Sequence, residues 1–247
     1  RQRQMCIRDR PLAEIYGLLT GPPAWRRSLL TTLKELGFKR HPMAPCVVIM
    51  YEEIGGQPMQ FSGLIVIETD DLLGGGIGHQ FDLAVTELRK RYNFGKWIVL
   101  QEQSAEYGGR TLKQNSDYEF EISMTRYLEQ NAREIRIERG RMKNPDAEAT
   151  PVEVTAMRGL VGKLSWAARE GMPQGAGDVS ILASTFPQPR VKDLSEANSA
   201  LRRLLQNSAP IRIRPIPLDR LKLLLFADSS LANAGGGSAP VSYTHLR

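Results

Sequence analysis

The order of apolar patterns in the first part of the chain constrains the fold most strongly. Residues 47–51 and 61–67 are rich in β-branched and aromatic side chains, which is typical of strands, and Gly55 and Gly56 between them favour a turn. One amphipathic helix pattern precedes this strand pair, and another follows it. Helices on either side of an adjacent strand pair predict an α+β fold rather than a regular βαβ repeat.

The two helix patterns have recognisable ends. Pro22 and Pro23 fit a first helical turn, where a missing N–H costs nothing, and Gly37 fits a C-terminal stop. Apolar residues recur every three or four positions: Trp25, Leu29, Leu33 and Leu36 in the first helix, and Phe81, Ala84, Leu88 and Tyr92 in the second. Residues 97–100 have a strand-like composition again.

The chain becomes mostly helical from about Val152. Two apolar stripes predict helices there: Met157, Leu160, Val161, Leu164 and Ala168, and then Leu194, Ala197, Leu201, Leu204 and Leu205. Residues 143–151, which are polar and contain two prolines, are the predicted linker. Residues 221–227 predict a fully buried strand that leads into Asp228.

Both ends of the chain differ from the rest. Residues 1–10 and 241–247 resemble translated sequencing adapter, and we expect them to be non-native tails outside the fold. They carry four of the six net positive charges, so the remaining body of about 230 residues has a net charge of only +2. Global charge therefore does not indicate a nucleic-acid partner, although a body of this length can bury a sizeable core.

Composition argues against several kinds of site. Only Cys46 remains once Cys6 of the tail is set aside, so we expect no disulfide framework or cysteine zinc site, and a reducing, intracellular setting is favoured. The histidines, His41, His79 and His245, are too scattered for a metal site. No apolar run reaches the roughly 18 residues of a spanning helix, so we expect no membrane partner.

The chemistry is concentrated at Asp70 and Asp71, which closely follow the second predicted strand. Nucleotidyl transfer uses carboxylates that hold two divalent cations about 3.5–4 Å apart. An aspartate pair at the tip of an apolar hairpin provides such ligands on a rigid support. Taken alone, however, two aspartates after a strand are more often ordinary turn residues.

The surrounding sequence resembles the reverse transcriptase of copia-type LTR retrotransposons. In that family, Tyr-Gly-Leu and Pro-x-x-Trp lead a helix ending in Leu-Gly-Phe, a Pro-Cys strand follows, and a hairpin carries Tyr-Val-Asp-Asp-Leu. The matching residues are Tyr16, Gly17, Leu18, Pro22, Trp25, Leu36, Gly37, Phe38, Pro45, Cys46, Asp70, Asp71 and Leu72. A weaker resemblance continues at 158–164, 173–180 and 226–229, the last similar to the opening of the family's RNase H domain.

The resemblance implies a particular domain order. A partial reverse-transcriptase palm and thumb would occupy 11–144, with an antiparallel sheet and packed helices in the palm. A mostly helical connection region would follow at 145–210, and the first strand of an RNase H-like domain would lie within 211–240.

The resemblance also implies the chemistry and its partners. Asp70 and Asp71 would be catalytic and metal-binding, Asp228 would be a metal ligand of the RNase H domain, and Mg²⁺ or Mn²⁺ would be the cofactor. The implied partners are an RNA or DNA template-primer, dNTP and the remaining Pol polyprotein segments. The implied location is a cytoplasmic particle and the nucleus.

Departures from the family pattern leave a second function open. Glu68 and Thr69 stand where the family has tyrosine and valine. Because alternate strand residues share a face, we expect Glu68 to point the same way as Asp70, where it could join a metal site or repel a triphosphate. The family's third palm aspartate is expected upstream of this chain. The alternative function is a decayed or co-opted copy that binds nucleic acid or a partner without catalysis.

Other motifs fit structural roles better. The glycines at 74, 76 and 78 have the wrong spacing for dinucleotide binding. Residues 162–163 lack the first glycine of a P-loop and are expected in a helix, with Gly162 in its core and Lys163 exposed. The basic stretch at 133–143 could contact template phosphates, but a solvated helix face is the favoured interpretation. Trp97 and Trp166 are expected in the core rather than as base-stacking platforms.

Overall fold

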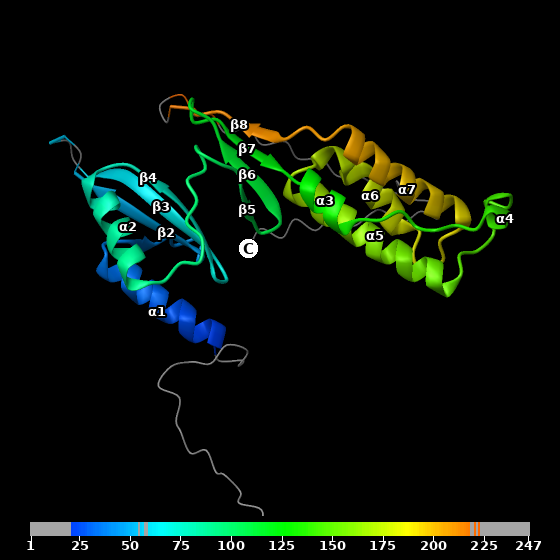
Figure 1. The fold of residues 1–247 in the computed structure, drawn as a ribbon, viewed down its shortest axis with the longest axis horizontal. Helices are drawn as coiled ribbons and strands as arrows, with labels where there is room; N and C mark the ends of the chain where they lie inside the picture. Colours follow the sequence, from blue (N-terminus) through cyan, green and yellow to red (C-terminus); the bar gives the residue numbers. More distant parts are fainter. Residues whose placement is uncertain (1–20, 54, 57–58, 218–219, 221, 223–247) are drawn as a thin grey trace, which may run out of the picture. The chain divides into compact units, whose positions relative to one another are not determined.

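The computed structural model describes residues 21–53, 55–56, 59–217, 220 and 222 (Figure 1). The chain forms two compact units that divide between Trp97 and Ile98. Within the described ranges, each unit has one antiparallel four-stranded sheet, and the two units together have seven α-helices. The predicted α+β class is therefore confirmed.

The sheet of the first unit has the strand order β1-β2-β3-β4. Its strands are β1 (Lys39–Arg40), β2 (Val47–Glu52), β3 (Gln60–Glu68) and β4 (Asp71–Gly76). The two predicted strands correspond to β2 and β3, and β4 is the second strand of the predicted hairpin, although it includes the glycine run. A Cβ at Gly76 would lie 2.6 Å from the ring of Phe81, so glycine at this position lets that ring pack on the sheet.

Two helices complete the first unit, as the sequence predicted: α1 (Gly21–Glu35) and α2 (His79–Arg91). They share one core with the sheet: Leu29, Leu33, Phe38, Val48, Met50, Ile65, Ile67, Phe81, Ala84 and Leu88. The predicted glycine stop of α1 is confirmed. Gly37 has a φ of 96°, and the N–H of Phe38 donates to the carbonyl oxygen of Leu33 at 2.9 Å, as in a Schellman motif.

A buried carboxylate caps the start of α2. Glu52 is only 2% exposed, and one of its oxygens accepts a hydrogen bond from the N–H of Gln80 at 2.8 Å. Gly78 precedes the helix with a φ of 100°, and a Cβ there would lie 1.3 Å from the other Glu52 oxygen. Glu52 therefore supplies the negative charge at the N-terminus of α2, which supports the rejection of a dinucleotide-binding motif there.

Two predictions for residues 97–100 are wrong. The segment belongs to no strand, and Trp97 is 42% exposed instead of lying in the core. A short apolar run becomes a strand only where another strand pairs with it, and this run spans the division between the two units. The guanidinium of Arg89 lies over the Trp97 ring, 4.5 Å from its centroid.

The second unit contains a sheet whose strands we did not predict from the sequence. It consists of β5 (Ala105–Tyr107), β6 (Arg110–Gln114), β7 (Phe120–Ser123) and β8 (Ile211–Ile213), in that order. The first three strands are joined by consecutive hairpins. The fourth returns from far along the sequence to pair with β7, and Ile211 lies opposite Ile122.

Helices make up much of the rest of the second unit (Figure 1). They are α3 (Thr125–Asn131), α4 (Arg139–Met142), α5 (Pro151–Glu170), the 3₁₀-helix η1 (Pro173–Gly175), α6 (Ala176–Ser184) and α7 (Val191–Gln206). Both predicted apolar stripes lie in one core, in α5 and α7, and Trp166 is half-buried against it. Of the helices that the structure describes, none combines the length and apolarity that crossing a membrane requires.

An extended segment at residues 132–138 runs along this core, and a buried asparagine holds it. The Asn198 side chain on α7 accepts a hydrogen bond from the N–H of Ile135 at 2.7 Å and donates to its carbonyl oxygen at 2.9 Å. Ile135 and Ile137 are buried, whereas Arg133 and Arg136 are exposed. Up to residue 138 the basic stretch is therefore an extended segment and not a helix face, with Arg136 in solvent between two buried isoleucines.

Residues 143–151 do not link compact units, because they lie inside the second one. The N–H of Ala149 donates to the carbonyl oxygen of Pro189 at 2.9 Å, and the N–H of Val191 donates to that of Ala147 at 3.0 Å. The segment ends in a capping box in which the side chains of Thr150 and Glu153 each accept a hydrogen bond from the other's backbone N–H. Its two prolines therefore indicate a packed connection rather than a free linker.

The capping glutamate makes stability depend on pH. Burial opposes ionisation of Glu153, but hydrogen bonds from the Thr150 backbone and Arg141 outweigh it and hold the pKa of Glu153 below its usual 4.5. A lowered folded-state pKa stabilises the fold above the unfolded pKa, and this stabilisation is lost as pH falls through the folded pKa. Glu153→Gln keeps an oxygen for the capping box but loses the charge that accepts two hydrogen bonds from Arg141, so we expect it to cost about 1 kcal/mol at neutral pH and progressively less below pH 4.5.

Urea denaturation at neutral and at acidic pH measures this difference. The matched control is Glu148→Gln, which removes an exposed carboxylate just before the same helix. This control should change the free energy of unfolding by less than about 0.5 kcal/mol. Equal losses in the two variants, or a loss in Glu153→Gln that does not shrink in acid, would contradict the role given to Glu153.

Several predictions fall outside the residues that the structure describes. These are the two tails at 1–10 and 241–247, the motif at 16–18, all of the strand at 221–227 except residue 222, and Asp228.

Candidate functional site

The predicted aspartate pair lies at the end of the β3–β4 hairpin. Glu68 ends β3 and pairs with Asp71, the first residue of β4, so Thr69 and Asp70 form a two-residue loop. Thr69 has a φ of 56°, and a positive φ at the first loop position is what a type II′ turn requires. Glycine usually occupies that position, so a β-branched threonine introduces backbone strain beside the aspartates.

The hairpin separates apolar and acidic side chains onto different faces. Ile67 is 3% exposed, and Leu72 opposite it packs against the same core. Glu68 and Asp71 form the next opposed pair and therefore point to the other face, where Asp71 is exposed. We predicted that Glu68 points the same way as Asp70, because alternate residues of a strand share a face. This prediction is wrong, because β3 ends at Glu68 and the turn begins, and Glu68 shares its face with Asp71 instead.

A guanidinium that was not predicted from the sequence as a site residue lies at the same end of the sheet. The N–H of Ile67 donates to the carbonyl oxygen of Cys46 at 2.8 Å, which continues the β2–β3 pairing toward the hairpin tip. Arg26 of α1 donates to the carbonyl oxygen of Pro45 at 2.7 Å, and its other terminal nitrogen lies 3.5 Å from the Cys46 sulfur. Sequence spacing could not reveal this contact, because it joins residues 20 positions apart.

The carboxylates at the tip suit a divalent cation in type but form an incomplete set. Asp70 and Asp71 are exposed and offer the oxygen ligands that Mg²⁺ prefers. Where the structure describes the chain, no three histidine, cysteine, aspartate or glutamate side chains are grouped so that they could hold a metal ion. The pair by itself therefore does not constitute a two-metal site, and Asp228 lies outside the described residues.

The rejected P-loop motif has no phosphate-binding geometry. Gly162 and Lys163 are in the middle of α5, and no turn or helix start is present there to bind a phosphate. Gly162 is exposed, so it is not part of the helix core.

The fold and the hairpin define an α+β chain that presents an acidic pair at the exposed tip of an antiparallel sheet. The chain is 25% identical over 227 residues to the putative transposon Ty5-1 protein of Saccharomyces cerevisiae, and the alignment covers 87% of this chain and 70% of that protein. No protein-family model matches the chain, and no solved structure matches it. The chain is thus a distant relative of a Ty5 retrotransposon protein.

Proposed function

We propose that this chain is a fragment of the RNA-directed DNA polymerase of a copia-type LTR retrotransposon and that its first unit is part of the palm. The observation that carries the proposal is the exposed Asp70–Asp71 tip on an antiparallel sheet backed by α1 and α2. The ordered motif matches and the distant relation to the Ty5-1 protein support it.

In this proposal Asp70 and Asp71 hold Mg²⁺ or Mn²⁺, which would neutralise the charge that develops during nucleotidyl transfer. Their exposure leaves the tip open to dNTP, to the template-primer and to a further carboxylate of the polymerase. Asp228 would be a metal ligand of the RNase H domain. The other Pol segments would be partners, and a cytoplasmic particle and the nucleus would be the location.

A decayed or co-opted copy is the second candidate, and one observation favours it. Glu68 lies directly opposite Asp71, and like charges at opposed positions of an antiparallel pair are unfavourable. The family tyrosine would not place this charge beside the tip. A copy with this change would keep the fold and could bind nucleic acid or a partner without catalysis.

Template-directed synthesis tests the proposal. The chain is joined to the upstream reading frame of its parent transcript and supplied with an RNA template, a DNA primer and dNTP. We expect incorporation that requires Mg²⁺ and stops with EDTA, whereas the chain by itself should give none, because its aspartate pair is an incomplete ligand set. If the protein with its upstream sequence folds but never incorporates dNTP, the result would favour a decayed or co-opted copy.

A further inference from the structure

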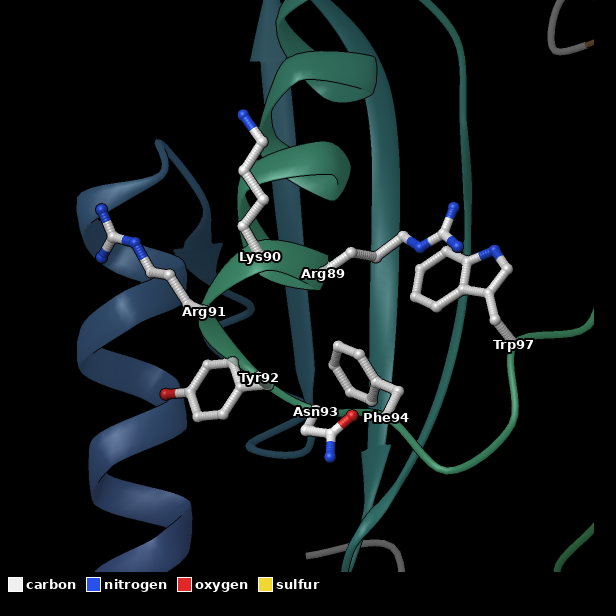
Figure 2. Close-up of a pocket in the computed structure, with 7 residues that line it drawn as sticks. All are labelled: Arg89, Lys90, Arg91, Tyr92, Asn93, Phe94 and Trp97. Carbon is white, nitrogen blue, oxygen red and sulfur yellow. The ribbon is translucent and has the colours of Figure 1, made fainter.

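A pocket of about 360 Å³ lies in the first unit, where α2 ends (Figure 2). Its lining is basic and aromatic, and it contains no carboxylate: Arg89, Lys90, Arg91, Tyr92, Asn93, Phe94 and Trp97. A volume of this size is at the lower end of the range for small-ligand pockets. The lining therefore favours a ligand that is both anionic and flat.

The three consecutive cations of the pocket differ in their partners. Lys90 pairs with Glu87 at 2.6 Å, and Arg91 pairs with Glu35 at 2.6 Å. Arg89 makes no ion pair with any residue in the described part of the chain, and Figure 2 shows its side chain extended toward the Trp97 ring. Among the three cations of the pocket, Arg89 is thus the one without a carboxylate partner in the described part of the chain, and its guanidinium lies over the Trp97 ring instead.

The aromatic residues form a row that fixes the position of Trp97. The rings of Phe94 and Trp97 meet edge to face, with their centroids 5.6 Å apart. The ring centroid of Tyr92 lies 6.2 Å from that of Phe94, and the ring centroid of Trp25 of α1 lies 5.2 Å from that of Tyr92. The Tyr92 hydroxyl also forms a hydrogen bond with the Thr32 hydroxyl at 2.9 Å. Trp97 is therefore supported on one side while 42% of its surface stays exposed.

We propose that this pocket binds a single-stranded segment of nucleic acid, with a base stacked on the part of the Trp97 ring that Arg89 leaves exposed and an adjacent phosphate on the Arg89 guanidinium. Stacking on an exposed indole and pairing with a guanidinium are the two contacts by which single strands are held without sequence preference. A free phosphate or an acidic peptide would use Arg89 but would gain little from the indole face. The biological setting of this inference rests on the proposed polymerase function, but the contact does not involve the aspartate hairpin.

The test is binding of a fluorescein-labelled oligo(dT) to the full chain, measured by anisotropy in EDTA. Trp97→Ala should weaken binding roughly 5- to 150-fold, the range of one stacked base, and Trp97→Phe should recover part of this loss. Arg89→Glu should also weaken binding. Arg89→Ala should make the slope of the logarithm of the binding constant against the logarithm of the salt concentration less negative by about 0.7, the effect of one lost phosphate contact.

Two control variants separate this pocket from general charge and from the proposed active site. Arg136→Glu makes the same charge change at an exposed position of the second unit and should alter affinity less than about twofold. Asp70→Asn should leave binding in EDTA unchanged even if it abolishes synthesis. Loss of binding in Arg89→Glu but not in Trp97→Ala would identify a simple anion pocket and overturn the proposal. An equal loss of affinity in Arg136→Glu, or no binding of the oligonucleotide at all, would overturn it as well.

Discussion

Asp70→Asn is expected to lower Mg²⁺-dependent synthesis by the upstream-extended protein more than about 100-fold, because loss of a direct metal ligand should exceed the roughly 10- to 100-fold effect of residues that only orient the ligands. The change removes a negative charge at nearly constant shape, and Asp70 is exposed at a loop position, so the fold should be unaffected. Primer extension on an RNA template measures the rate. Synthesis that survives Asp70→Asn would refute the assignment of this site.

Neighbouring substitutions show which part of the hairpin matters. Asp71→Asn should have a smaller effect, because Asp71 begins β4 on the face it shares with Glu68, whereas Asp70 lies in the loop. Glu68→Tyr restores the family residue and should raise the rate if the glutamate repels nucleotide. Asp117→Asn alters an exposed aspartate between β6 and β7 and should leave the rate unchanged.

Asn198→Leu is expected to lower the free energy of unfolding of the second unit by about 2–6 kcal/mol, since two buried polar groups lose their partner and each costs about 1–3 kcal/mol. The substitution removes both hydrogen bonds to Ile135 and leaves its N–H and carbonyl groups without the Asn198 partner. Urea denaturation followed by the fluorescence of Trp166, which packs on the same core, measures the loss.

A matched asparagine provides the control for this prediction. Asn131 is exposed at the end of α3, where its side chain donates to the carbonyl oxygen of Tyr127 at 2.9 Å. Water can replace that bond, so Asn131→Leu should change the free energy of unfolding by less than about 0.5 kcal/mol. Similar losses in the two variants would show that Asn198 contributes no more than a surface residue does.

Periodicity predicted those parts of the fold whose apolar pattern is local. The buried face of α5 from Met157 to Ala168 and the end of α1 at Gly37 were predicted from residues only a few positions apart, and both are confirmed. The pairing of β7 with β8 and the bond between Asn198 and Ile135 join residues far apart in the sequence. No local pattern could indicate them.

The candidate site was predictable in position but not in geometry. Two aspartates after an apolar strand indicated a hairpin tip, and the structure places them there. The orientation of Glu68 depends on which two residues form the loop, and a threonine with positive φ is not what turn propensities favour. The stacking of Arg89 on Trp97 depends on where the first unit ends, which composition did not reveal.

The long stretch of sequence between β7 and its partner β8 has a consequence for synthesis of the protein on the ribosome. β7 is complete at Ser123, but its partner strand begins only at Ile211. One side of β7 therefore stays unpaired while the intervening helices are translated, and an unpaired strand edge can pair with other chains. The first unit pairs all its described strands locally, so it can fold early, whereas the sheet of the second unit is complete only after β8 has emerged.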